Sequence, residues 1–379
     1  MVNNSFFAGG SKIDGGAGND TLTFNFAANF APLADTLKNI ETMHFGGGPD
    51  DDPYIVHLND ANVAAGATLT VFLDGPVANF LGFDETDARF HFIASTYDTT
   101  LSGGALSDLF DIRAHAVDEI HGGGGDDKIL IGTGLTADDF IDGGDGNDLL
   151  VLSPSSYAGG PSIQLGNFYS VNTMLLQTGG SYDFTESASI VLRGETMTVD
   201  GRKLGAENQL SFDGSLETRG NLILIGGAGN DTLIGGHGND KLFASGGVTN
   251  VLQGGAGADE IHCGAGADTI NYLAVSDSTG AAHDTIFRFD GAVDHLTFPT
   301  SVSAVDPTFK GGSFSEASFD QDVAAAVSTL AAFHAVVWQP SYGVAILVVD
   351  TNGVTGYQAG SDFAVEFLHP RNIGLLLDS

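Results

Sequence analysis

The sequence predicts an all-β fold: an elongated parallel β-roll or β-solenoid, in two tandem halves, with a small C-terminal α+β cap. Glycine-rich turns that end in aspartate recur at nine-residue spacing within residues 225–271, a period typical of stacked coils. A short triplet with an apolar centre follows each turn, as expected for a strand with one buried side chain. IDGGAGNDTLTF at 13–24 returns as IDGGDGNDLLVL at 141–152, which indicates a duplicated unit.

The turns of the second half have the form GGxGxD and span 226–231, 235–240, 254–259 and 263–268. Adjacent glycines allow positive φ angles, so the chain can turn sharply and aim its carbonyl oxygens inward. The aspartate at the sixth position adds a hard carboxylate oxygen, and Ca²⁺ takes six to eight such oxygens. The turns therefore predict several bound Ca²⁺ ions, against the alternative of glycine loops with solvated aspartates.

Successive turns fall on opposite edges of a solenoid, so an ion is expected between each turn and the next but one. Turns 235–240 and 254–259 form the best predicted site. The opposite edge, from Asp231 to Asp268, crosses a degenerate turn at Asn250 and is less complete. The predicted metal ligands of this array are Gly227, Gly229, Asp231, Gly236, Gly238, Asp240, Gly254, Ala256, Asp259, Ala265 and Asp268.

The first half carries a more degenerate array. A turn at 13–22 stands alone, and no complete same-edge partner for it is visible in the sequence. Turns at 103–108, 122–127 and 143–148 follow on one predicted edge. The predicted metal ligands here are Asp20, Asp108, Asp127 and Asp148. The repeat gives three predicted domains: 1–140, 141–275 and a cap with a secretion region at 276–379.

These turns resemble the GGxGxDxUx nonapeptide of the RTX calcium-binding family. The segment 284–298 is similar to the closing element of RTX proteins, and 348–367 resembles the C-terminal domain of serralysin-type proteins and bacterial surface-layer proteins. The resemblance implies a protein exported by type I secretion from a Gram-negative bacterium, guided by an uncleaved C-terminal signal. The N-terminus has no secretory signal peptide, which agrees with that expectation.

Composition excludes several classes of partner. The formal net charge is −35, so nucleic acid and anionic membrane are poor partners, because both need a basic surface. No run of 18 apolar residues occurs, so no membrane insertion is expected. Cys263 is the only cysteine, and an intrachain disulfide is therefore excluded.

The C-terminal region predicts one helix over 318–335, with a capping box from Ser318 and Gln321. The segment 350–362 could hold one more ion or form a tight turn capped by Asx side chains. The end, 372–379, suits either an export signal or a final strand.

No enzyme is expected. No histidine begins an HExxH motif and no serine lies in GxSxG, so the common zinc-protease and lipase motifs are missing. Two suitably placed carboxylates would suffice for a glycoside hydrolase, and that alternative stays open.

The favoured function is a secreted calcium-binding structural protein that folds and self-assembles with Ca²⁺ at the cell surface, as a surface-layer or matrix component. The expected partners are other copies of the chain, the type I secretion machinery and, as a further candidate, surface polysaccharide. An adhesin that binds sugar or another cell, or an exported enzyme without a recognisable motif, are the alternatives. Because the turn at Asp20 lacks a visible partner, a second copy is expected to cover it, unless residues 25–60 fold back over it.

Overall fold

The structure is a computed structural model. It describes residues 12–24, 29–30, 37–46, 54–74, 77–94, 99–112, 118–132, 135–136, 138–153, 163–186, 190–312 and 314–375. The chain forms two compact units, Met1–Gly180 and Ser181–Ser379. The predicted domain boundaries after residues 140 and 275 follow the sequence repeat and stay predictions.

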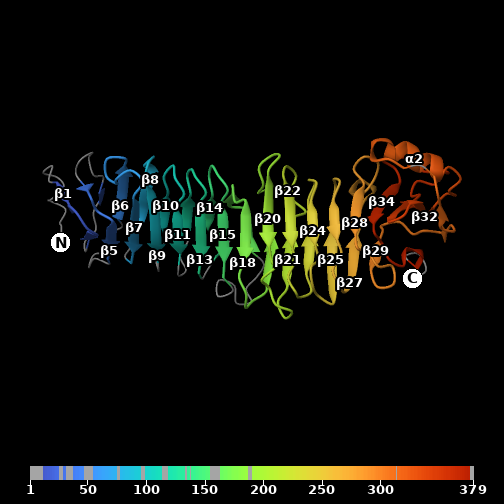
Figure 1. Cartoon of the computed structure of the whole chain (residues 1–379), viewed down its shortest axis with the longest axis horizontal. Coiled ribbons are helices and arrows are strands. Elements are labelled where there is room, and N and C mark those ends of the chain that lie inside the picture. The colour runs from blue at the N-terminus through green and yellow to red at the C-terminus, as the bar shows by residue number, and fades with distance from the viewer. Residues whose placement is uncertain are drawn as a thin grey trace. The chain divides into compact units, whose positions relative to one another are not determined.

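The first unit is a parallel β-solenoid (Figure 1). Its strands are β1 (Ile13–Asp14), β2 (Thr21–Phe24), β3 (Asn29–Phe30), β4 (Leu37–Lys38), β5 (Thr42–Phe45), β6 (Tyr54–Asn59), β7 (Thr68–Leu73), β8 (Val77–Asp84), β9 (Arg89–Ala94), β10 (Thr99–Ser102), β11 (Leu109–Ile112), β12 (Asp118–His121), β13 (Lys128–Ile131), β14 (Phe140–Asp142), β15 (Leu149–Leu152), β16 (Ile163–Gln164), β17 (Phe168–Tyr169) and β18 (Thr173–Leu176). Strands β2, β5, β7, β9, β11, β13, β15 and β18 pair in parallel in that order. Strands β3, β6, β8, β10, β12, β14 and β17 form the facing parallel sheet.

The second unit repeats this arrangement and adds the cap. Its strands are β19 (Tyr182–Thr185), β20 (Thr196–Asp200), β21 (Leu210–Asp213), β22 (Asn221–Ile225), β23 (Thr232–Ile234), β24 (Lys241–Phe243), β25 (Thr249–Gln253), β26 (Glu260–His262), β27 (Ala267–Asn271), β28 (Asp284–Phe287), β29 (His295–Thr297), β30 (Ala304–Val305), β31 (Phe309–Lys310), β32 (His334–Ser341), β33 (Val344–Val349) and β34 (Phe363–Leu368). Even-numbered strands β20 to β28 form one parallel sheet, and odd-numbered strands β19 to β29 form the other.

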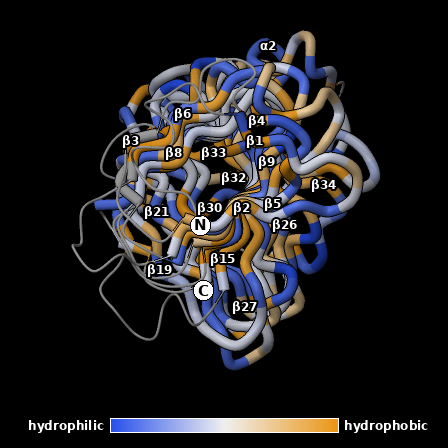
Figure 2. The backbone as a smooth tube through the Cα atoms, turned by 90° about the vertical axis from the view of Figure 1, so that its left-hand side faces the viewer, coloured by the Kyte–Doolittle hydropathy of each residue, from blue (hydrophilic) through white to orange (hydrophobic). Residues whose placement is uncertain are grey.

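The apolar residue after each turn builds the core, as predicted. Leu224, Leu242, Ile261 and Ile286 stand in register in one sheet, and all four are fully buried. Leu233, Leu252 and Ile270 do the same in the facing sheet. In Figure 2 the hydrophilic colours lie mostly in the outer turns and the apolar segments toward the middle. Strand pleating explains this, since alternate side chains point to opposite faces.

The cap continues the solenoid and then reverses direction. Strand β34 pairs in parallel with β28, while β32, β33 and β34 pair antiparallel with one another. Helix α2 (Phe319–Ala326) lies beside this sheet (Figure 1). Its Phe319 and Val323 side chains pack in one cluster with Trp338 and Ile346. Short 3₁₀ turns occur at η2 (Val275–Asp277), η3 (Glu316–Ser318) and η4 (Ile373–Leu375).

The helix predicted over 318–335 is wrong in its length and its cap. It ends at Ala326, and β32 begins at His334. The Ser318 hydroxyl donates to Asp322 Oδ2 at 2.7 Å, so it caps no backbone N–H and no capping box forms. The apolar residues after 326 instead fill a turn against the sheet, where Leu330 is buried.

The segment 350–362 adopts the Asx-capped turn, one of its two predicted forms. Asp350 Oδ1 accepts the Gly353 N–H at 2.8 Å, and Asp362 Oδ2 accepts the Gln358 N–H at 2.7 Å. Residues 376–379, half of the predicted export signal, lie outside the described residues. Among the described residues, no helix is long and apolar enough to cross a membrane.

Candidate metal sites in the turns

The aspartate turns line up along three edges. In the second unit, one edge carries Asp240, Asp259 and Asp284 and is called the Asp240 edge. The other, the Asp231 edge, carries Asp231, Asn250, Asp268 and Asp294. In the first unit the Asp108 edge carries Asp108, Asp127, Asp148 and Asn172. Along each edge the turns are spaced by one full coil of the solenoid.

Each edge is joined by a ladder of hydrogen bonds between neighbouring turns. The backbone N–H of Asp240 donates to Asp259 Oδ1 at 2.8 Å, and that of Asp259 donates to Asp284 Oδ1 at 3.0 Å. Asp127 N–H donates to Asp148 Oδ1 at 2.8 Å in the same way. The ladder fixes one oxygen of each carboxylate and stacks the acidic groups above one another.

The second carboxylate oxygen separates the turns into two forms. In the closed form, the N–H of the second glycine donates to Oδ2 of the aspartate in its own turn. These pairs are Gly104–Asp108 at 2.8 Å, Gly227–Asp231 at 2.8 Å, Gly236–Asp240 at 2.6 Å and Gly264–Asp268 at 2.6 Å.

In the open form, the aspartate Oδ2 is buried and has no hydrogen-bond partner among the described residues. This holds for Asp20, Asp127, Asp148 and Asp259. The second glycine of each open turn has positive φ. The angles are 88° at Gly16, 99° at Gly123, 89° at Gly144 and 100° at Gly255. The rotated peptide aims its N–H elsewhere, so the free oxygen follows from the backbone form.

Carbonyl oxygens of the preceding turn point at the open turn. A Cβ atom at Gly255 or Gly257 would collide with the carbonyl oxygens of Gly236 and Gly238, respectively. Gly144 and Gly146 stand in the same relation to the carbonyls of Gly123 and Gly125. Carboxylate and carbonyl oxygens therefore converge between paired turns, and oxygen donors of this kind are what Ca²⁺ prefers.

Burial disfavours the charged form of these carboxylates unless a cation is bound beside them. It raises the pKa of Asp127 to about 8 and that of Asp259 to about 8, because the charged form loses its hydration. The pKa of Asp108 and that of Asp240 rise to about 6 for the same reason. A bound Ca²⁺ would stabilise the charged forms and displace their protons. The residues present thus fit calcium.

The predicted best site is brought together in the structure. The turn with Gly236, Gly238 and Asp240 stacks on the turn with Gly254, Ala256 and Asp259, and Ala256 N–H donates to the Gly236 carbonyl at 3.0 Å. Here Gly236 and Gly238 would supply carbonyl oxygens and Asp259 its free Oδ2.

Asn250 separates the predicted ligands of the Asp231 edge. Its Oδ1 accepts the Asp231 N–H at 2.8 Å, while its amide nitrogen donates to Gly246 O and Asp268 Oδ1, both at 2.8 Å. The amide group thus occupies oxygens that a cation would need. Gly227 and Gly229 remain in the closed turn of Asp231, and Ala265 in that of Asp268.

Among the described residues the Asp20 turn has a neighbouring turn on one side only: residues 38–41 continue its ladder, whereas a Cβ atom at Gly16 or Gly18 would meet nothing within 4 Å, so the expected lack of a complete same-edge partner stays a prediction. Asp20 N–H donates to Glu41 Oε2 at 2.8 Å, and Gly15 N–H donates to the Lys38 carbonyl at 3.0 Å. A glutamate here occupies the place that aspartate occupies elsewhere in the ladder. No glycine pair precedes Glu41 in the sequence, so the nonapeptide pattern could not find this turn.

Several ladder residues lie outside the repeat pattern. Asp284 and Asp294 accept the N–H groups of Asp259 and Asp268 and so form the last members of their edges. Glu186 is also buried, with both carboxylate oxygens unpartnered among the described residues, and burial raises its pKa to about 8. The nonapeptide pattern could not identify Glu186, because it is an isolated acidic residue that follows β19 rather than a glycine-rich turn.

The fold and these turns define a class: a parallel β-solenoid with buried oxygen ligands for cations between its coils. The family model of the RTX calcium-binding nonapeptide repeat, built from four copies, matches residues 8–30, 117–134, 131–153, 220–248 and 246–278. The chain carries RTX calcium-binding repeats, and both the predicted family and the predicted Ca²⁺ cofactor are confirmed. No curated protein matches the chain.

Proposed function

We propose that this protein is an exported, calcium-dependent structural component of the surface of a Gram-negative bacterium, in a surface layer or an extracellular matrix. The supporting observation is the distribution of the open turns. Asp127 and Asp148 lie in the first unit and Asp259 in the second, so calcium ligands run through the whole fold. Such a distribution suits a scaffold that depends on calcium for its own order.

The net charge of the chain supports the proposal that it folds only after export. A chain with net charge −35 repels itself at low calcium and is compacted when Ca²⁺ neutralises its carboxylates. Extracellular calcium sites work at Kd values of about 10⁻⁴–10⁻³ M, far above cytosolic calcium. The chain would therefore stay unfolded for type I secretion, then fold outside and associate with further copies and with surface polysaccharide.

Circular dichroism and light scattering on the full chain test this proposal. In metal-free buffer we expect little β structure; millimolar Ca²⁺ should produce it, followed by scattering from assemblies. An unchanged spectrum across the titration would contradict calcium-dependent folding. If the chain folds with calcium but does not assemble at any protein concentration, the surface-layer role would be contradicted and calcium-dependent folding would stand.

An adhesin is the second candidate, and one surface feature favours it. A hollow of about 470 Å³ is lined by Lys310, Gln339 and Tyr342, and Tyr342 is fully exposed. An exposed aromatic ring beside polar side chains suits a sugar. Binding of a glycan by the monomer, lost in Tyr342→Ala, would favour this function over assembly.

A further inference from the structure

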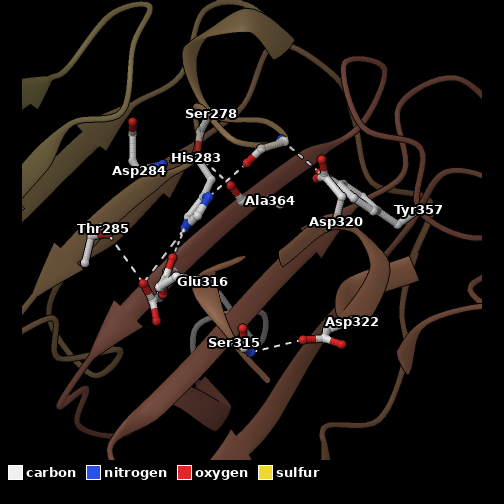
Figure 3. Close-up of polar contacts among 12 residues, drawn as sticks. Ser278, His283, Asp284, Thr285, Ser315, Glu316, Asp320, Asp322, Tyr357 and Ala364 are labelled. Carbon is white, nitrogen blue, oxygen red and sulfur yellow. Dashed lines mark hydrogen bonds and ion pairs between the residues drawn. The ribbon is translucent and has the colours of Figure 1, made fainter. Parts of the chain in front are cut away.

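A cluster of three ligating side chains lies in the cap, outside the calcium turns. His283 immediately precedes β28, Glu366 lies in β34, and Glu316 begins η3. Ligand atoms of the three lie within 4.8 Å of one another. Figure 3 shows the imidazole of His283 directed at Glu316, with the adjacent strands beneath.

The imidazole of His283 is held in a single orientation and tautomer. Its side chain is 8% exposed, and Phe319 stacks on the ring with centroids 3.5 Å apart. Nδ1 lies 2.9 Å from the Gly280 carbonyl, which can only accept, so Nδ1 carries the proton. Nε2 therefore faces the two glutamates and, in the neutral imidazole, presents its lone pair to them.

The distances do not correspond to hydrogen bonds. Nε2 lies 3.7 Å from Glu316 Oε2 and 3.9 Å from Glu366 Oε2. By contrast, His334 in the same cap bonds Asp306 at 2.8 Å. Nε2 of His283 thus faces both glutamates from a side chain that is 8% exposed, at distances longer than a hydrogen bond.

The buried carboxylate of Glu366 lies beside the same point. Its side chain is 5% exposed, and the Thr285 hydroxyl donates to its Oε2 over 3.5 Å, which is long for a hydrogen bond. A buried carboxylate beside a second carboxylate is costly unless a cation joins them.

We propose that His283, Glu316 and Glu366 bind one Zn²⁺ ion. Tetrahedral zinc at about 2.0–2.2 Å from N and O ligands places those ligand atoms about 3.4 Å apart, a few tenths of an ångström closer than here. Glu316 is 64% exposed and free to make that adjustment. Calcium suits this site poorly, because Ca²⁺ takes oxygen ligands whereas imidazole nitrogen suits zinc.

The site leaves a fourth coordination position and links distant segments. A hollow of about 250 Å³ lies against His283 and Glu316 and is lined also by Ala281 and Gln321, leaving room for a water ligand. Zinc would fasten the segment before α2 onto the sheet at β28 and β34. This inference is independent of the proposed surface role.

The test uses the full chain folded in millimolar Ca²⁺, so that the calcium turns are already filled and do not compete for the added metal. Co²⁺ is titrated as a spectroscopic probe and then displaced by Zn²⁺, and zinc affinity is measured by equilibrium dialysis. We expect one Co²⁺ with the visible absorption of a tetrahedral site. His283→Gln should bind zinc at least ~10–100-fold more weakly, since even outer-shell changes cost that much.

The control is His334→Gln, which removes a cap histidine already paired with one carboxylate and should keep wild-type zinc affinity. Glu316→Gln is a second test variant, needed if His283→Gln fails to fold. Because the Glu316 side chain is exposed, this substitution should leave the circular dichroism spectrum unchanged. Zinc should raise the melting temperature of the wild-type protein, because it binds the folded state, and Glu316→Gln should abolish this rise. Equal zinc affinity in wild type, His283→Gln and Glu316→Gln, or no tetrahedral cobalt spectrum, would overturn the proposal.

Discussion

Single carboxylate oxygens decide which aspartates are ready to bind calcium. Asp259 and Asp108 occupy equivalent places in their turns, yet Oδ2 is unpartnered in Asp259 and bonded to Gly104 N–H in Asp108. A cation gains the free oxygen of Asp259 at no cost in hydrogen bonds. At Asp108 it must first displace a backbone donor.

Asp259→Asn should therefore weaken calcium binding by roughly tenfold or more, since the charge of the ligands sets the affinity of such sites. Asp108→Asn should have a clearly smaller effect. Calcium titrations followed by circular dichroism give the midpoints. Equal shifts in the two variants would mean that the free oxygen does not determine affinity.

Asn250→Asp should create a further calcium site on the Asp231 edge. The new carboxylate would face Asp268 and lose the two hydrogen bonds that the amide donates. Without calcium we expect a loss of roughly 1–3 kcal/mol of stability; with calcium, one more ion per chain by equilibrium dialysis. Asn230→Asp adds the same charge at an exposed position nearby and serves as the control. An unchanged ion count in Asn250→Asp would refute this prediction.

At the scale of elements, the turn backbone carries the ligand geometry. Gly257 and Gly360 both have positive φ, at 142° and 80°, but only Gly257 lies against a carbonyl, that of Gly238. Alanine at either position costs about 1–2 kcal/mol for the backbone form alone. Gly257→Ala adds a collision inside the site.

Gly360→Ala should therefore lower the melting temperature slightly and leave the calcium midpoint unchanged. Gly257→Ala should lower stability further and raise the calcium concentration needed for folding. Thermal unfolding at several calcium concentrations measures both effects. Similar behaviour of the two variants would show that close approach of the turns is unimportant.

Much at this scale could be predicted from sequence, and the limits have physical causes. The nonapeptide spacing identified the strands around Leu242 and Ile261, because turn and strand are both local features. The spacing did not extend to Asp284, which a long loop with η2 separates from the preceding strand, and only the resemblance of 284–298 to a closing element pointed to that segment. Whether a turn is open or closed depends on how it stacks on its neighbours, which the motif does not encode. The GGxGxD turns at 226–231 and 235–240 are closed, whereas the turn at 143–148, with the same motif, is open.

For the molecule as a whole, the buried acids predict how pH acts without calcium. Asp127 and Asp259 have pKa values of about 8 in the fold, against 3.8 for the ordinary side chain. A raised pKa contributes stability that is present at low pH and lost as pH rises through the folded value. The metal-free protein should thus become less stable from about pH 5 to 8.

Saturating calcium should remove this dependence, and calcium binding near pH 7 should release protons. Thermal unfolding at each pH in metal-free buffer, with Asp259→Asn as the control, measures the effect. The variant should show a shallower decline. A metal-free protein whose stability rises across this range would contradict the buried-acid account.

The hydrogen-bond ladder of the turns has the same polarity on the described edges of both units. Asp127 N–H needs the carboxylate of Asp148, Asp240 N–H needs that of Asp259, and Asp259 N–H needs that of Asp284. In every case the donor comes earlier in the sequence than its acceptor. In this carboxylate ladder each turn is therefore completed by the turn that follows it, whereas backbone bonds such as that from Ala256 N–H to the Gly236 carbonyl run the other way. Removing the coil of Asp284 would leave the buried N–H of Asp259 without its carboxylate acceptor, so the end of each ladder supports the turn before it.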